Sequence, residues 1–275
     1  MTPRQYSNWY YKNHNKYERK AFGIVKKRIE KLLVKINYRS LTPTNYKKAI
    51  TKEVKEDDFL KMLNELYLTI GIIHGNRIYQ GIANDNLNIK AARPMFNEAF
   101  QELLLIWLRR NAGTKIKTIR KSFINTLIDF IANESDEGIS INKIVSSIIK
   151  TFGNKKGLYR SQIMRIVRTE TAAAANYAAL QAMESENLII DKVWISTHDN
   201  RTRDGDSRNE YDHLAMHGVT KPREELFKVP NQNGDFDSIL FPADPTGEPG
   251  NVINCRCTIA PKPRRNEQGF LILKL

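Results

Sequence analysis

Apolar residues recur three and four positions apart along most of the first 186 residues, the spacing that places them on one face of an α-helix. Phe22, Val25, Ile29 and Leu32 form one such stripe. The pattern predicts helices over residues 14–37, 56–83, 94–110, 115–133, 141–152 and 157–186. No strand-like alternation of useful length lies among them, so most of the chain is expected to fold as packed helices.

The pattern changes after about residue 190. Residues 191–196 predict a β-strand, residues 197–206 a polar loop, and residues 211–217 a short helix. Residues 218–254 are rich in Pro, Gly, Asn and Asp and predict turns and short strands, and residues 257–260 a last strand. This part of the chain is therefore expected to mix strands with short helices.

Together these patterns predict an α+β protein with a mostly α-helical N-terminal body. Its expected parts are a basic helical domain over residues 1–155, a small α+β module over residues 156–263 and a C-terminal tail over residues 264–275. The tail contains the apolar run FLILKL. It is interpreted as an edge strand or docking segment, with a partner-binding peptide as the alternative.

Composition excludes several classes of protein. Hydrophobic residues make up 41% of the 275 residues, which excludes a disordered chain of low hydrophobicity. No apolar run approaches the ~18 residues of a membrane span, and the N-terminus has no signal-peptide pattern. We therefore expect no membrane partner, and a protein that stays in the cytoplasm in which it is made unless a larger particle carries it out.

The net charge of +14 is distributed unevenly. Residues 1–50 contain 13 Lys and Arg but only two acidic residues, whereas residues 166–275 contain 13 basic and 16 acidic residues. The basic end also carries aromatic residues such as Trp9, Tyr10 and Tyr11. Cations interleaved with aromatic rings are typical of nucleic-acid contacts, so the sequence predicts a nucleic-acid-binding segment that includes Arg19, Lys20, Lys26, Lys27, Arg28 and Lys31. The alternative is a solvated helix face with a tail that docks on a neighbouring subunit.

Cys255 and Cys257 are the only cysteines, and their Cys-x-Cys spacing is too close for an easy mutual disulfide. Two thiolates on one side of a strand can share a metal with His213 and His217, which lie on one face if their segment is helical. His₂Cys₂ is a ligand set that suits tetrahedral Zn²⁺. The hypothesis is a structural zinc site, and the alternative is that the four side chains never meet.

Candidate acids, bases and nucleophiles also gather in residues 194–257, among them His198, Asp199, Arg203 and His213. No hydrolase, kinase or nucleotide-binding motif accompanies them. We therefore predict that the protein is not an enzyme. The alternative is a nuclease or toxin-like enzyme that uses this His/Asp/Arg cluster.

An ordered series of short motifs runs through the same module. It consists of Arg168-Thr169-Glu170, Trp194-Ile195-Ser196, Arg201-Thr202-Arg203, His213 with Gly218, Phe227, Phe241-Pro242-Ala243-Asp244-Pro245 and Asn254-Cys255-Arg256-Cys257. In this order and at these gaps, the series resembles the phage Mu protein F-like family, the minor head or head morphogenesis proteins of tailed bacteriophages. The resemblance covers about residues 156–260. One departure is His217, where the family usually has an acidic residue.

The resemblance implies a minor capsid protein inside the phage head, near the portal vertex, with a role in head morphogenesis and in packaging or ejection of DNA. The implied partners are the portal protein, the major capsid protein and packaged double-stranded DNA. Among the shared residues, Trp194 is expected as a core anchor, Arg168, Glu170 and Arg203 as a polar network, and Asp244 as the residue that fixes a turn.

Overall fold

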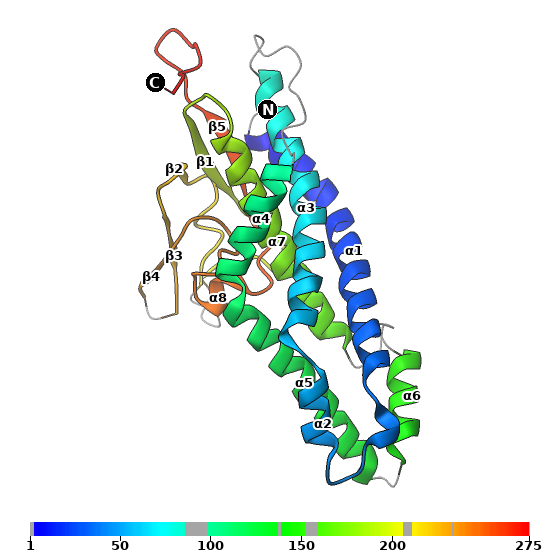
Figure 1. Cartoon of the computed structure of the whole chain (residues 1–275). Helices are drawn as coiled ribbons and strands as arrows, with labels where there is room; N and C mark the ends of the chain where they lie inside the picture. Colours follow the sequence, from blue (N-terminus) through cyan, green and yellow to red (C-terminus); the bar gives the residue numbers. More distant parts are fainter. Residues whose placement is uncertain are drawn as a thin grey trace.

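The computed structural model describes residues 3–85, 98–136, 139–151, 159–205, 211–232 and 234–274, and in them the chain is an α+β protein (Figure 1). Its helices are α1 (Pro3–Lys35), α2 (Tyr46–Glu53), α3 (Glu56–Asp85), α4 (Glu98–Asn111), α5 (Gly113–Asp136), α6 (Ile141–Thr151), α7 (Arg160–Glu184) and α8 (Pro249–Val252), with a 3₁₀ turn at Tyr38–Ser40. Its strands are β1 (Ile190–Ile195), β2 (Thr220–Pro222), β3 (Phe227–Pro230), β4 (Phe236–Ile239) and β5 (Thr258–Pro263).

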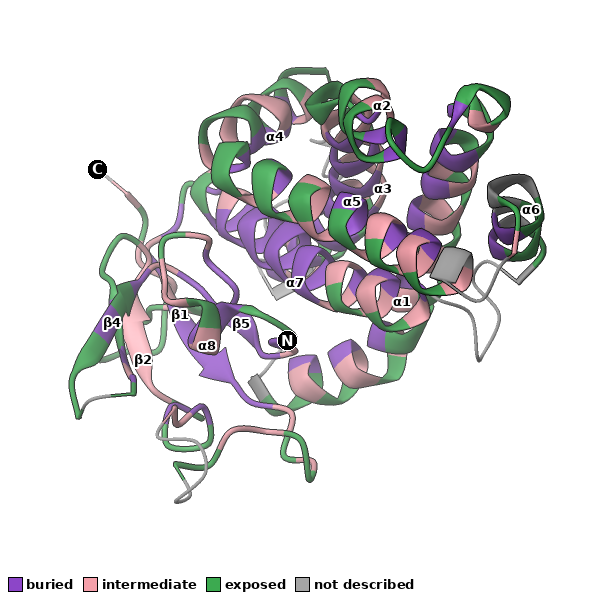
Figure 2. Cartoon of the chain, turned by 90° about the horizontal axis from the view of Figure 1, so that it is seen from below, coloured by how far each residue is buried: buried purple, intermediate pink, exposed green. Residues whose placement is uncertain are grey.

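The long helices α1, α3 and α7 form the centre of the molecule, and α3 makes its most extensive packing with α7. Helix α7 contains the run Ala172–Ala175, which is buried all around the helix and whose small side chains let neighbouring backbones approach closely. Gly71 serves the same purpose on α3, because a Cβ there would lie 2.9 Å from Leu104 Cδ1 on α4. The result is a helix, α7, that is buried along most of its length (Figure 2).

Two small antiparallel sheets lie beside these helices. The first has the order β2-β1-β5, with Val193 opposite both Thr220 and Ala260, and the second pairs β3 with β4. β1 is the central strand and is buried over most of its length, since α7 packs against the adjacent β5. Even Lys192 on β1 is buried, and its Nζ donates to the carbonyl oxygens of Arg223 and Leu240.

One predicted element is absent where it was expected. Residues 211–217 form turns rather than a helix, because the backbone N–H groups of His213 and Leu214 both donate to the carbonyl of Arg203 instead of to the preceding turn of a helix. Helix α2 and the short α8 were not predicted, and both are too short for a clear apolar period. The expected helices over 94–110 and 141–152 extend into residues outside the described ones.

The Asn176 side chain joins α7 to the strand module. Its amide nitrogen donates to the carbonyls of Pro242 and Cys257, and its oxygen accepts from Thr258 Oγ1 and the Ile259 N–H. Helix α7 thus packs on α3 on one side and bonds to β5 on the other. A division of the chain at residue 155 stays a prediction, since the helix that follows this position belongs by packing to both parts.

Helices α1 and α3 enclose a cluster of aromatic and imidazole rings. His74 of α3 is fully buried, and its Nε2 lies 3.0 Å from the Tyr6 hydroxyl of α1. His14 of α1 stacks on Tyr10, with Nε2 3.3 Å from Glu18 Oε1. Although that carboxylate is near, burial, together with Arg256 and Arg168, lowers the pKa of His14 to about 4. Burial lowers the pKa of His74 to about 3. Both rings are therefore neutral in the folded protein at neutral pH.

Acid should therefore destabilise the fold through His14. The unfolded imidazole binds a proton near pH 6.5, whereas the folded one binds it near pH 4, so the stability that neutral His14 provides is complete above pH 6.5 and falls as the pH drops toward 4. His14→Gln should reduce this loss by about 3 kcal/mol in urea unfolding measured between pH 7 and 4. The exposed His198→Gln is the matched control and should keep the wild-type slope. Identical pH slopes for wild type and His14→Gln would contradict the prediction.

Candidate metal centre

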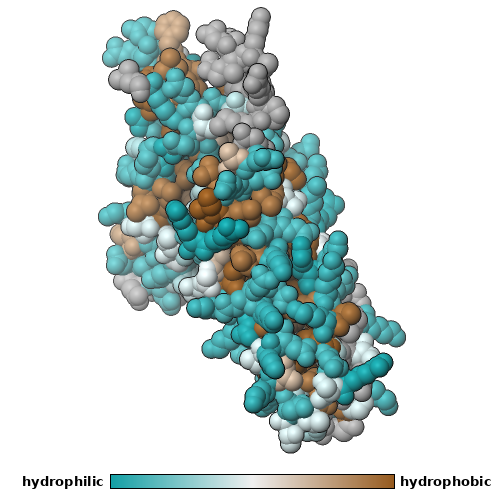
Figure 3. Space-filling view, viewed as in Figure 1, coloured by the Kyte–Doolittle hydropathy of each residue, from teal (hydrophilic) through white to brown (hydrophobic). Residues whose placement is uncertain are grey.

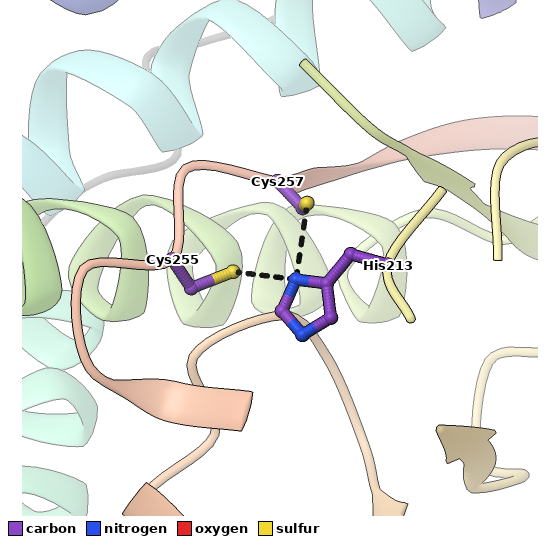
Figure 4. Close-up of side chains that lie close together, drawn as sticks. All are labelled: His213, Cys255 and Cys257. Carbon is purple, nitrogen blue, oxygen red and sulfur yellow. Dashed lines mark hydrogen bonds between the residues drawn. The ribbon is translucent and has the colours of Figure 1, made fainter. Parts of the chain in front are cut away.

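Three of the four predicted metal ligands meet in the strand module. His213 Nδ1 lies 3.7 Å from Cys255 Sγ and 3.5 Å from Cys257 Sγ, and the three ligand atoms all lie within 4.8 Å of one another (Figure 4). All three side chains are buried, each at most 2% exposed. Within the described residues, these three form the one group of at least three His, Cys, Asp or Glu side chains that lie close enough together to hold a metal ion.

Local backbone structure brings the three residues together. After α8, Asn254 adopts a left-handed conformation (φ 58°), and its N–H donates to Thr169 Oγ1 on α7. This bend directs Cys255 inward, and the pairing of Thr258 with Ile195 then places Cys257 beside the end of β1. The two cysteines thus lie in the loop before β5, rather than on one side of a strand as the sequence predicted.

A hydrogen-bond chain fixes the orientation of the imidazole. Asn251 Nδ2 donates to Asp237 Oδ2 at 2.7 Å, which leaves Asn251 Oδ1 as an acceptor 3.0 Å from His213 Nε2. His213 Nε2 therefore carries the hydrogen, and the lone pair of Nδ1 faces the two sulfur atoms. A carboxylate or amide behind the imidazole is the usual support of a metal-bound histidine. Sequence spacing gave no signal for Asn251, because it belongs to α8 and meets His213 only in the fold.

The two thiols do not ionise alike. The hydrogen bond with Cys257 lowers the pKa of the Cys255 thiol below its usual range, while the same bond and burial raise the pKa of Cys257. A thiolate is the form of cysteine that binds metals. Cys255 is thus the thiol that ionises more easily. The positive charge of a bound metal ion would favour ionisation of Cys257 as well.

His217 lies outside this group, which corrects its prediction as a ligand. Its side chain is exposed, its Nδ1 accepts the Ser196 N–H at 3.1 Å, and its ring meets the His198 ring edge-on with centroids 4.1 Å apart. The error has a definite cause: side chains four apart share a face only in a helix, and residues 211–217 form turns. Three protein ligands are left, as in zinc sites whose fourth position is taken by water or another group.

Trp194 closes one side of the centre. It is fully buried, and its ring meets the rings of His213 and Phe227 edge-on, with centroid distances of 5.6 and 5.3 Å. Asp244 fixes the turn after Phe241, because its carboxylate accepts from the N–H groups of Leu240 and Thr246 and from the Thr246 hydroxyl. Both residues have structural roles in the module.

The residues expected as one polar network make separate contacts instead. Glu170 is buried and accepts from the Tyr67 hydroxyl at 2.8 Å and from Lys115 Nζ at 3.0 Å. Arg203 donates to the carbonyl of Ile253 at 2.6 Å. Arg168 faces the other way, toward α1, with its Nε 3.7 Å from Glu18 Oε1. Each side chain therefore connects α7 or the loop after β1 to a different neighbour.

The acids and bases of the alternative enzyme hypothesis do not form an open catalytic cluster. His213 is 1% exposed and faces the thiols. Asp199 makes a two-pronged ion pair with Arg256, at 2.5 and 2.6 Å, which lowers the pKa of the carboxyl group to about 2. The Asp244 carboxylate accepts the hydrogen bonds of the turn described above. No observation in the described part of the chain favours the hypothesis of a nuclease.

The predicted nucleic-acid-binding residues all lie on α1 but differ in availability. Arg19, Lys20, Lys27 and Lys31 are exposed. Lys26 pairs with Glu30 at 3.6 Å. Arg28 bonds to Glu65 of α3, at 2.6 Å for Nε, and so holds two helices together. Four of the six are thus free to contact a polyanion.

The aromatic residues of the basic segment do not offer stacking platforms. Tyr6, Tyr10 and Tyr17 are buried, and Trp9 and Tyr11 pack against the same core. The three buried tyrosines lie on the side of α1 that packs against the core, whereas Trp9 has the helical spacing of Lys12 and Lys16 and is covered by His74 and Arg77. Any nucleic-acid contact of α1 would therefore be electrostatic.

Comparison with known proteins agrees with this architecture. Residues 129–260 match the family model described as Phage Mu protein F like protein, a span that runs from α5 through the metal-ligand group to β5. Neither the curated proteins nor the solved structures contain a match to the chain. The family is one of phage head morphogenesis, with a structural role. Residues 129–260 therefore form a domain that is similar to the phage Mu protein F-like family.

Proposed function

We propose that this protein is a bacteriophage minor capsid protein that acts in head morphogenesis at the portal vertex and in packaging or ejection of DNA. The observation that carries the proposal is the Mu F-like domain, residues 129–260, packed against a basic helix, α1. Residues 166–275, which contain most of this domain, have slightly more acidic than basic residues, and this suits contacts with the portal and major capsid proteins. None of the helices among the described residues is long and apolar enough to cross a membrane.

Deletion of the gene from the phage tests this role. We expect heads still to form, because a minor protein does not build the shell, but the particles should lose infectivity or package DNA poorly. Electron microscopy, the DNA content of the particles and the titre are the measurements, with the protein supplied from a plasmid as the control. Normal infectivity of the deletion phage would count against the proposal, as would absence of the protein from purified particles.

The outer face of α1 is the proposed DNA contact. Its exposed cations are Lys12, Lys16, Arg19, Lys20, Lys27 and Lys31. They recur at intervals of three, four and seven residues, with a single one-residue step at Arg19 and Lys20, so they share one side of the helix. From Lys12 to Lys31 the helix rises about 28 Å, most of one turn of B-DNA. Such a row of cations binds phosphates without reading the base sequence.

Removal of these charges should weaken DNA binding. The variant Arg19→Gln, Lys20→Gln, Lys27→Gln, Lys31→Gln should bind duplex DNA less tightly, and the slope of log K against log salt should fall by about 3 to 4 units. Fluorescence anisotropy at several salt concentrations is the measurement. A matched control removes two exposed cations of the module, Lys228→Gln and Lys262→Gln, and should leave the slope unchanged. Equal losses in both variants would refute a site on α1.

We further propose that His213, Cys255 and Cys257 bind a structural zinc ion. The site is buried, its ligands include two thiols, and the second ring nitrogen of His213 is held by Asn251. When bound, zinc would supply a fixed link between the turn after β1 and the loop before β5. The three residues come from segments more than 40 positions apart, so such a link would stabilise the module against unfolding.

Metal analysis tests the zinc proposal. Purified full-length protein should contain one equivalent of zinc, and chelation should lower its melting temperature by about 5 °C or more. Cys257→Ser, which nearly conserves volume, should lose the metal, while His217→Ala should retain it. Elemental analysis and thermal unfolding are the measurements. The proposal fails if the protein holds no stoichiometric metal and chelation leaves the melting temperature unchanged.

A further inference from the structure

A groove lies between α5, the N-terminal half of α7 and the segment around α8. It encloses about 350 Å³, within the range of ~300–1,000 Å³ typical of binding pockets. Its apolar lining includes Phe59 of α3, Ile119 of α5, Ile166 of α7, and Pro249 and Ile253 of the segment around α8. Apolar side chains also appear in the middle of the face that carries α4 and α5 (Figure 3). The groove is therefore an apolar cavity open to solvent.

Two cations accompany this apolar lining. Lys115 Nζ donates to the buried Glu170 carboxylate, which neutralises one charge. Arg165 is exposed, and among the described residues it makes no ion pair. The groove thus combines apolar walls with one free positive charge at its edge. An occupant that complements it would carry an apolar side chain beside an acidic one.

The C-terminal residues of the chain have this combination. Residues 264–274 fold into a hairpin that closes through Asn266: its N–H donates to the Phe270 carbonyl, and its side-chain oxygen accepts the Phe270 N–H. The hairpin is tied to the start of β1 by hydrogen bonds between Ile189 and both Ile272 and Arg264. It projects from one end of the molecule, next to the C-terminus (Figure 1). Its form is therefore set before any partner binds.

The tip of this hairpin presents an aromatic ring beside a carboxylate. Phe270 is 69% exposed and Leu273 is 57% exposed, although both are large and apolar. Glu267 is exposed on the same turn and is the one acidic residue of positions 262–275. The exposure of Phe270 also shows that the hairpin does not occupy the groove of its own chain. The ring is therefore available to a cavity on another molecule.

We propose that the hairpin tip of one chain inserts Phe270 into the α5–α7–α8 groove of a second copy, with Glu267 against Arg165. Donor and acceptor surfaces differ, so the contact is heterologous and repeats from copy to copy, closing into a ring where the rotation permits. An exposed aromatic residue that enters an apolar pocket is typical of the residues that dominate binding energy. The contact requires neither DNA nor metal, so it stands apart from the proposed function.

Sedimentation velocity of the purified full-length protein over a range of concentrations tests the proposal. Wild type should associate as its concentration rises. Phe270→Ala should weaken the association about tenfold or more, and so should Thr118→Trp, which places a large side chain at the exposed edge of the groove. Phe236→Ala on β4, also an exposed aromatic, and Lys117→Trp, on the side of α5 that faces away from the groove, are the matched controls and should associate like wild type.

Charge reversal provides the decisive comparison. Glu267→Lys and Arg165→Glu should each weaken association, and the double variant should restore it, because the opposite charges face one another again. Both residues are exposed, so neither change is expected to disturb folding. A protein that stays monomeric at every soluble concentration overturns the proposal. So does association that Phe270→Ala leaves unchanged, or a hairpin that proves necessary only for binding the portal protein.

Discussion

The four hydrogen bonds of the Asn176 side chain hold the two structural parts of this protein in register. Asn176 lies in the middle of α7, directly after a run of four alanines, and it is fully buried. A buried amide without partners would cost about 1–3 kcal/mol per unsatisfied group. The fold satisfies it with backbone groups of Pro242, Cys257 and Ile259 and with the Thr258 hydroxyl. The helical body and the strand module therefore have a single relative position.

The metal-ligand group depends on the same register. β5 begins one residue after Cys257, and Asn176 holds the Cys257 carbonyl directly. On the other side of the loop, Thr169 of α7 accepts the Asn254 N–H, one residue before Cys255. Both cysteines are thus positioned by α7, while His213 is positioned by the backbone of Arg203 and by Asn251. Preorganisation of this kind allows three ligands distant in sequence to face a common point.

The sequence predicts the helical framework well, because long apolar stripes at helical spacing leave few alternatives. The expected helices over 56–83, 115–133 and 157–186 correspond to α3, α5 and α7 within a few residues. Local spacing fails where tertiary contacts decide. Helical spacing pairs His217 with His213, whereas backbone hydrogen bonds to Arg203 make that segment a series of turns instead. The mixture of cations and aromatic residues along α1 predicts stacking platforms, but only the packing of α1 shows which of these side chains are buried.

The loop from Val252 to Cys257 connects the two candidate sites of the module. Val252 and Ile253 form part of the groove wall, while Cys255 and Cys257 face His213. Between them, Asn254 is held to α7, and Arg203 holds the Ile253 carbonyl. A six-residue segment with these fixed points has little freedom to move one side without the other. The Asn-Cys-Arg-Cys motif is therefore a structural element of both sites: its cysteines define the metal-ligand group, and its first residue sets the position of the groove wall.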